Sequence, residues 1–174
     1  MNLDKIEIKS RKLSYLLRHD NDYKLESGGW RLVSDLILRH SFTVTEIDEI
    51  VSTDSKGRFQ LSEDKTKVRA LYGHSVNIDL VLAPEEPPES LYHGTASKYL
   101  SSIKQSGLIA KARQYVHLTE DIDMAIKTGR RHGKSVLLKI LTHKMDADGY
   151  VFYHLSNGVW LTDEVPLQYI DFKY

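Results

Sequence analysis

Two histidines in apolar, strand-like surroundings are the first residues of this chain to suggest chemistry. His93-Gly94-Thr95 ends one apolar run, and His117 lies inside another, residues 116–118. Gly94 has no Cβ, so a ligand could approach its backbone closely, and the His93 ring offers a donor for a ligand hydroxyl. Two simpler alternatives stay open: an ordinary turn at 93–95, and a hydrogen-bonded core histidine at position 117.

Arginines form a second group. Arg18-His19 closes an amphipathic N-terminal segment, Arg69 lies in an alternating run, Arg113 precedes the run that holds His117, and Arg130-Arg131 stands in a polar turn. Guanidinium groups bind phosphate oxygens in pairs, so these residues predict an anionic ligand. The net charge is zero, but ten Lys or Arg face only three Asp or Glu between positions 98 and 144. A solvated basic helix face, or an exposed basic turn at 130–131, is the alternative.

Composition excludes several classes of protein. The chain has 174 residues and no cysteine, which excludes a disulfide framework and a thiolate metal site. The eight histidines lack the spacing of metal ligands, so we expect no metal. No G-x-G-x-x-G run is present, which sets a Rossmann site aside. The N-terminus has no apolar signal core and no run is long enough to span a membrane, so we expect a cytoplasmic protein.

Prolines divide the chain. Three of the four lie among glutamates at residues 84–89, which predicts a semi-extended linker between a lobe over residues 1–83 and a lobe over residues 90–174. In the first lobe, apolar spacing predicts a helix through Leu17, a short helix after a buried Trp30, and a helix that starts near Thr43. Two alternating runs then predict a hairpin. This order favours a winged-helix-like lobe.

The second lobe mixes short strands with helices, so the predicted fold class is α+β and a doubly wound sheet is excluded. Gly107 is the expected C-cap of the helix predicted over residues 98–105. The predicted strands cover residues 90–92, 116–118, 136–140, 151–153, 159–161 and 169–172, and the predicted helices cover residues 98–105 and 122–128.

Several short runs follow one another along the chain: Leu16-Leu17-Arg18-His19, Arg69-Ala70-Leu71-Tyr72-Gly73-His74-Ser75, Leu91-Tyr92-His93-Gly94-Thr95, Tyr115-Val116-His117-Leu118-Thr119, Gly129-Arg130-Arg131-His132-Gly133-Lys134 and Asn157-Gly158-Val159-Trp160-Leu161-Thr162. In these residues and in their order, the chain resembles the RNA 2′-phosphotransferase family (NAD-dependent tRNA 2′-phosphotransferase, KptA type). Tyr72 departs from the glutamine expected before the glycine. The resemblance implies a second lobe with the split β-sheet of ADP-ribosyltransferases.

The resemblance also implies which residues act. The family's Arg-His-Arg-Arg set maps onto both halves of the chain, at Arg18, His19, Arg69 and Arg113. NAD, as co-substrate and without a metal, would be held by His93, Gly94, Thr95, Ser102, His117, Arg130 and Arg131. Val159 stands where many protein-modifying relatives of this fold have a glutamate. The implied partner is an RNA that carries a 2′-phosphate, from tRNA processing or an oligonucleotide, and the protein would be a monomer.

The implied reaction transfers an internal RNA 2′-phosphate to NAD. The products would be an RNA 2′-hydroxyl, nicotinamide and ADP-ribose 1″,2″-cyclic phosphate, formed through an RNA 2′-phospho-ADP-ribose intermediate. Two other classes stay open. One is an ADP-ribosyltransferase that modifies nucleic-acid phosphate ends, and the other is a non-enzymatic winged-helix protein that binds nucleic acid.

Overall fold

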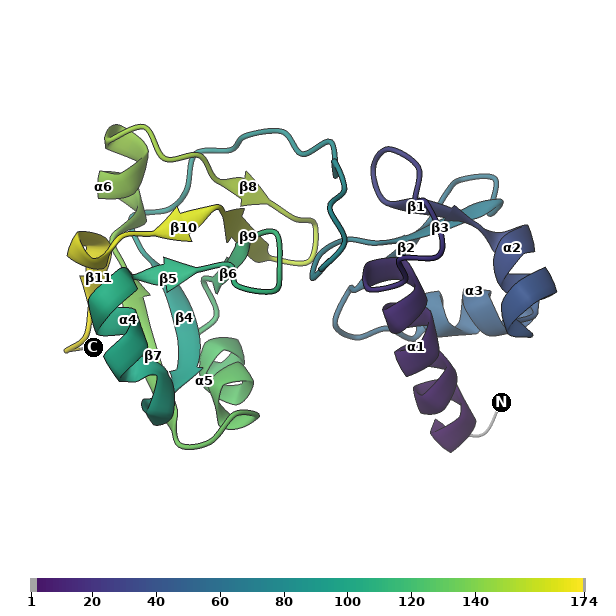
Figure 1. Cartoon of the computed structure of the whole chain (residues 1–174), viewed down its shortest axis with the longest axis horizontal. Coiled ribbons are helices and arrows are strands. Elements are labelled where there is room, and N and C mark those ends of the chain that lie inside the picture. Colours follow the sequence, from purple (N-terminus) through teal and green to yellow (C-terminus); the bar gives the residue numbers. More distant parts are fainter. Residues whose placement is uncertain (1–2, 174) are drawn as a thin grey trace. The chain divides into compact units, whose positions relative to one another are not determined.

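The chain changes packing partners close to its proline-rich segment. In the computed structural model, which describes residues 3–173, the chain divides into two units between Leu82 and Ala83 (Figure 1). Each unit combines helices with antiparallel sheet around its own hydrophobic core. The architecture is therefore α+β, as the sequence predicts. Within the described residues, no helix has both the length and the apolar character needed to cross a membrane.

Three helices of the N-terminal unit follow the predicted apolar spacing. Helix α1 spans Leu3–Arg18, α2 spans Val33–His40 and α3 spans Val44–Ser52. The start of α3 is the predicted one, because the Thr43 hydroxyl accepts from the amide of Glu46 while the Glu46 carboxylate accepts from the amide of Thr43. Leucines of α1 and isoleucines of α3 share one buried core.

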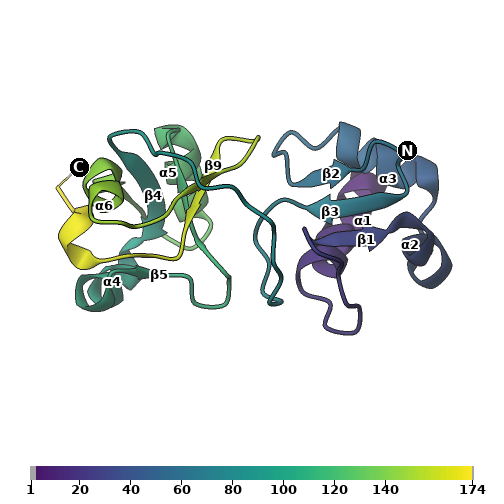
Figure 2. The same ribbon diagram turned by 90° about the horizontal axis from the view of Figure 1, so that it is seen from above.

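The sheet of this unit contains one strand that the sequence did not predict. The hairpin of β2 (Phe59–Leu61) and β3 (Lys67–Ala70) is confirmed, and β1 (Trp30–Leu32) adds to the other edge of β3 (Figure 2). In β1 the usual burial pattern is inverted, because Arg31 is buried and Leu32 is exposed. Trp30 is only half-buried, so the prediction of a buried aromatic there is wrong.

The C-terminal unit is built on a six-stranded antiparallel sheet in the order β11-β7-β4-β6-β9-β8. Its strands are β4 (Leu91–Ala96), β6 (Val116–Thr119), β7 (Ser135–Ile140), β8 (Tyr153–His154), β9 (Val159–Thr162) and β11 (Ile170–Asp171). The longest strands, β4 and β7, pair over six residues in the middle of this sheet. Neighbouring β4 and β6 carry the two predicted site histidines.

Helices and a small second sheet complete this unit. The 3-10 helix η1 (Ser97–Tyr99) leads into α4 (Leu100–Ser106), whose C-cap is Gly107, as predicted. Helix α5 (Ile122–Arg130) lies against β4 and extends two residues beyond its predicted end. The sequence did not predict α6 (Thr142–Ala147), η2 (Leu167–Tyr169) or the pair β5 (Leu108–Ile109) and β10 (Glu164–Val165). These elements are too short for a clear apolar period.

Candidate active site

The C-terminal end of α1 carries the first two predicted catalytic residues. Arg18 is the last helical residue, and the amide of His19 still donates to the carbonyl of Tyr15 (2.8 Å). The last carbonyls of a helix have no partner inside the helix. Here the Arg18 carbonyl accepts from the amides of Ser75 (3.0 Å) and Val76 (3.3 Å). A distant segment of the same unit therefore closes the end of α1.

This segment also holds the two side chains. The Nδ1 atom of His19 lies 2.8 Å from the hydroxyl oxygen of Ser75, so the contact orients the imidazole ring. The Arg18 guanidinium lies 5.0 Å from the centre of the Tyr72 ring, within the range of a cation–π contact. Tyr72, which departs from the family pattern, thus supplies a contact of its own.

His74 is a site residue that the sequence did not single out. It is buried, and neither ring nitrogen has a hydrogen-bond partner among the described residues. Burial, together with the nearby positive charges of Arg18 and His19, lowers the pKa of His74 to about 4. The ring is therefore neutral near pH 7 and stands beside a permanent cation. Its place in the family-like 69–75 segment was the available signal.

Arg69 leaves β3 from the same unit and is held on several sides. Its Nε donates to Gln60 Oε1 (2.8 Å), its Nη1 donates to the Gly28 carbonyl (3.2 Å), and its Cζ lies 4.5 Å from the centre of the Trp30 ring. Burial lowers the pKa of Arg69, but a guanidinium stays charged at neutral pH. The side chain is preorganised before any ligand binds.

The Gly28-Gly29 turn links Arg69 to His74. A Cβ at Gly28 would lie 3.3 Å from Arg69 Nη1, and one at Gly29 would lie 3.5 Å from His74 Nε2. On the other side, a Cβ at Gly73 would lie 3.4 Å from the Arg18 guanidinium carbon. The structure thus brings Arg18, His19 and Arg69 into one neighbourhood of the N-terminal unit. Two guanidinium groups close to neutral imidazole suit a phosphate monoester better than a neutral ligand.

In the C-terminal unit, the two predicted histidines are joined directly. The His93 Nδ1 atom lies 3.0 Å from the His117 carbonyl oxygen, which can only accept, so Nδ1 carries the proton. Desolvation lowers the pKa of His93, against the opposing effect of this hydrogen bond. A neutral ring protonated at Nδ1 leaves Nε2 as an acceptor. The expected ring donor is therefore replaced by an acceptor, to which a ligand hydroxyl can donate.

Arg113 lies in the loop between β5 and β6, with an exposed side chain. Its positive charge contributes to the lowered pKa of His93. The structure therefore places Arg113 within electrostatic range of the histidine pair.

Gly94 is glycine for a different reason from the one we expected. A Cβ built on it would lie only 1.6 Å from the carbonyl oxygen of Ala125 in α5. Gly129 of the same helix would meet the Thr95 carbonyl oxygen at 2.5 Å. The space left by the missing Cβ of Gly94 is filled by the backbone of α5 and cannot admit a ligand. The interpretation of Gly94 as an opening for a ligand is wrong at this position.

The remaining predicted residues are spread over the unit. Thr95 is buried in β4, Ser102 is exposed on α4, Arg130 is the last residue of α5, and the exposed Arg131 follows it as the C-cap. Ser102, Arg130 and Arg131 therefore lie outside the strands β4 and β6 that carry the two histidines. Residues 3–173, which the structure describes, contain no group of three or more His, Asp or Glu side chains arranged for a metal ion.

Comparison with known proteins gives one consistent result. The sequence model described as "RNA 2′-phosphotransferase, Tpt1 / KptA family" matches residues 4–164. A protein of Acaryochloris marina is 48% identical in an alignment of 168 positions that covers 92% of this chain and 93% of that protein. Proteins of Flavobacterium johnsoniae and Agrobacterium fabrum are 43% and 45% identical; the alignments cover 94% and 92% of this chain, and 94% and 91% of those proteins. Each bears the name "Probable RNA 2′-phosphotransferase".

Proposed function

This chain belongs to the RNA 2′-phosphotransferase family, and we propose that it uses NAD as the acceptor of the RNA phosphate. The family membership supports a transferase that removes a 2′-phosphate from RNA. In the first proposed step, a 2′-phosphate oxygen attacks C1″ of the nicotinamide ribose and nicotinamide leaves. In the second, the ribose 2″-hydroxyl attacks the same phosphorus. The RNA 2′-oxygen then departs with a proton, leaving ADP-ribose 1″,2″-cyclic phosphate.

One observation carries this proposal: the grouping of Arg18, His19 and Arg69 about the Gly28-Gly29 turn and the 73–75 segment. A phosphate monoester is already an anion near neutral pH, so it needs positive charge to position it and no base to activate it. Val159, buried in β9, fits a site that works without a glutamate at that position.

The C-terminal unit fits the ribose end of NAD. His93, neutral and protonated at Nδ1, can accept a hydrogen bond at Nε2 from a ribose hydroxyl. NAD would supply the electrophilic C1″ and the leaving nicotinamide. The Arg113 charge near His93 would attract the phosphate of the RNA substrate to the same place. Arg130 and Arg131 remain our proposed contacts for the NAD pyrophosphate.

The second step would draw on the preorganised cations. Attack on phosphorus places extra negative charge on the equatorial oxygens, and Arg18, Arg69 and Arg113 would stabilise it. His19, oriented by Ser75, would give a proton to the departing RNA oxygen or hold the phosphate.

The topology supports the expected lobes. The N-terminal unit runs α1-β1-α2-α3-β2-β3 with the sheet order β1-β3-β2, which is consistent with a winged-helix-like lobe. The C-terminal unit places its histidine strands β4 and β6 side by side in an antiparallel sheet, as an ADP-ribosyltransferase-like lobe would.

Incubation with NAD and a 2′-phosphorylated oligonucleotide tests the proposal through the products formed. ADP-ribose 1″,2″-cyclic phosphate and a 2′-hydroxyl oligonucleotide are expected. A stable ADP-ribosylated oligonucleotide as the end product would instead indicate a transferase that modifies nucleic-acid phosphates. Binding of the oligonucleotide without any turnover would indicate a nucleic-acid-binding protein without this activity.

A further inference from the structure

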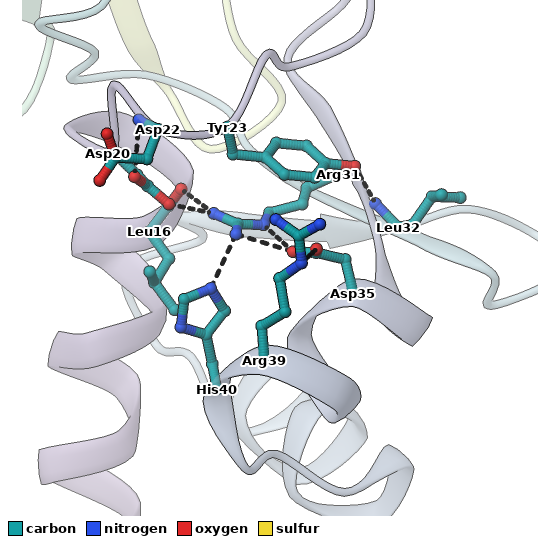
Figure 3. A network of polar contacts seen from close by, with 9 residues as sticks. All are labelled: Leu16, Asp20, Asp22, Tyr23, Arg31, Leu32, Asp35, Arg39 and His40. Carbon is teal, nitrogen blue, oxygen red and sulfur yellow. Dashed lines mark hydrogen bonds and ion pairs between the residues drawn. The ribbon is translucent and has the colours of Figure 1, made fainter.

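A buried arginine outside the predicted catalytic set organises the chain around Arg18 and His19. Arg31 of β1 is 1% exposed and lies at the centre of the network in Figure 3. Its Nη1 donates to the Leu16 carbonyl (3.0 Å) and to Asp20 Oδ2 (2.7 Å). Its Nε donates to Asp35 Oδ2 (2.8 Å), and its Nη2 lies 2.7 Å from the same oxygen.

His40 completes the set of partners. Arg31 Nη2 lies 2.8 Å from His40 Nε2 and must be the donor, because a guanidinium has no acceptor. Burial, and then the charge of Arg31, lower the pKa of His40, which favours the neutral ring that this contact requires. All five N–H groups of Arg31 thus have a partner. The ring of Tyr23 lies against the guanidinium, with its centre 4.0 Å from Cζ.

The partners of Nη1 stand on both sides of the catalytic pair. Leu16 lies two residues before Arg18, and Asp20 directly follows His19. The Leu16 carbonyl is in the last turn of α1, where a cation is favourable and carbonyls lack partners inside the helix. Burial raises the pKa of Asp20, but the hydrogen bond from Arg31 and a backbone hydrogen bond outweigh it, so the pKa lies below its usual value. Asp20 is therefore an anion at neutral pH.

We infer that Arg31 is a positioning residue that fixes the Arg18-His19 pair for the RNA phosphate. Its Nη1 atom donates to the chain before the pair, at Leu16, and after it, at Asp20. The Nε and Nη2 atoms bind Asp35 and His40 and so anchor the guanidinium to α2. A buried ion cluster is often no more stabilising than an apolar replacement, so its contribution here is to geometry. This inference rests on the proposed function, because it assigns Arg31 to that same site.

Arg31→Met tests the inference in the full-length protein. We expect the affinity for a 2′-phosphorylated oligonucleotide, measured without NAD, and the rate of cyclic-phosphate formation to fall by about 10²-fold, the typical cost of a catalytic group misplaced by about 1 Å. Affinity for NAD alone should stay unchanged. Lys9→Met is the matched control, because Lys9 also ties α1 to the neighbouring chain, through the Ser41 carbonyl (2.6 Å) and the Glu46 carboxylate (2.6 Å), but nine positions before Arg18.

A second pair of variants separates position from stability, and serves if Arg31→Met fails to fold. Asp20 and Asp35 bind the same guanidinium at the same distance of 2.7 Å and are similarly buried, with side chains 11% and 9% exposed. Asp20→Ala releases the side that holds the catalytic pair, whereas Asp35→Ala releases the α2 side. We expect Asp20→Ala to lose about tenfold more activity than Asp35→Ala at comparable urea midpoints.

Equal losses in the two aspartate variants, in proportion to their losses of stability, would show that the network is merely structural and would overturn the inference. The inference would also be overturned if the Arg31→Met protein bound the oligonucleotide and turned it over as well as the wild type does. Failure of the proposed function itself gives a different result, because the wild-type protein would then form no cyclic-phosphate product.

Discussion

At the residue scale, the site combines fixed positive charges with histidines whose surroundings keep them neutral. Arg69 is held by Trp30, Gln60 and Gly28 before any substrate arrives, and Arg113 lies in a loop near His93. The two arginines therefore differ in how rigidly each is held within its own unit.

Replacing either arginine by alanine should impair the second chemical step more than the first. The first step joins an anionic nucleophile to a cationic leaving group, so charge is neutralised, whereas the second builds up negative charge. Loss of one preorganised contact should cost about 10²–10³-fold in the second step, and ADP-ribosylated RNA should accumulate. Quenched time courses with labelled NAD measure both steps. Loss of activity without any intermediate in either variant would assign these arginines to binding or to step one.

His74 should make the stability of the N-terminal unit depend on pH. Its pKa of about 4 in the folded protein is below the ordinary value of 6.5. Between these values the unfolded chain holds a proton that the folded chain lacks, so stability is fully present above pH 6.5 and falls as the pH falls towards 4. The loss from this residue is roughly 3 kcal/mol over the window. Urea unfolding at several pH values measures it.

His74→Leu should flatten this profile, because the replacement cannot take up a proton. Some dependence of the same sign will remain in this unit, since the pKa of His40 is also lowered by burial. If the wild type and His74→Leu lose the same free energy between pH 6.5 and 4, the buried histidine is not the source.

At the scale of elements, the sequence predicted those helices and strands that carry their own local signals, such as capping residues and a regular apolar spacing. The capping residues Thr43 and Glu46 mark the start of α3, and Gly107 marks the end of α4. Strand β1 escaped prediction because its buried residue is Arg31 and its exposed one is Leu32, the reverse of the usual pattern. Only the tertiary partners of Arg31 explain that reversal, and they come from α1, from the loop that follows α1, and from α2.

For the site, the sequence likewise indicated residues that belong to local motifs but not the contacts that distant segments make with them. Motifs indicated His93 and His117, and in the structure the His93 ring is hydrogen-bonded to the backbone carbonyl of His117. No local pattern could show that Gly94 faces α5 rather than a ligand, because a glycine looks the same in sequence for either reason. His74 was missed since its lack of hydrogen-bond partners arises from the packing of segments that are distant in sequence.

Gly94→Ala should therefore destabilise the C-terminal unit by pushing α5 away from β4. The added Cβ would overlap the Ala125 carbonyl, and overpacking of this kind typically costs about 1–3 kcal/mol or more. Gly129→Ala, on the facing helix, should act in the same direction. Urea unfolding of both variants measures the effect. If the Gly94→Ala protein kept its normal stability and lost only its affinity for NAD, the missing Cβ of Gly94 would instead make room for the ligand.

At the scale of the whole molecule, the absence of net charge limits how RNA can be bound. Residues 1–82 contain 13 Lys or Arg and 13 Asp or Glu, and residues 83–174 contain 11 of each. Neither unit has the net positive charge that attracts long polyanions. The basic stretch at residues 98–144 is balanced by acidic residues elsewhere in its unit, so we expect recognition to depend mainly on cations at the 2′-phosphate itself.

The affinity for RNA should accordingly respond only weakly to salt. Each phosphate neutralised on a single strand contributes a slope of about −0.7 to log K against log salt, so two or three contacts predict a slope of roughly −2. Titrations of short and long 2′-phosphorylated oligonucleotides at several salt concentrations measure it. A much steeper slope that grows with RNA length would indicate an extended basic surface instead.

The closure of α1 by Ser75 and Val76 has a consequence for synthesis of the protein. The Arg18 carbonyl and the Ser75 hydroxyl that approaches it are 57 positions apart, so the end of the first helix is completed by nearly the last part of its unit. A nascent chain that has left the ribosome only as far as α3 can form the helix but cannot yet fix Arg18 and His19. Translation must pass residue 76 before the end of this unit that we propose for phosphate binding can form.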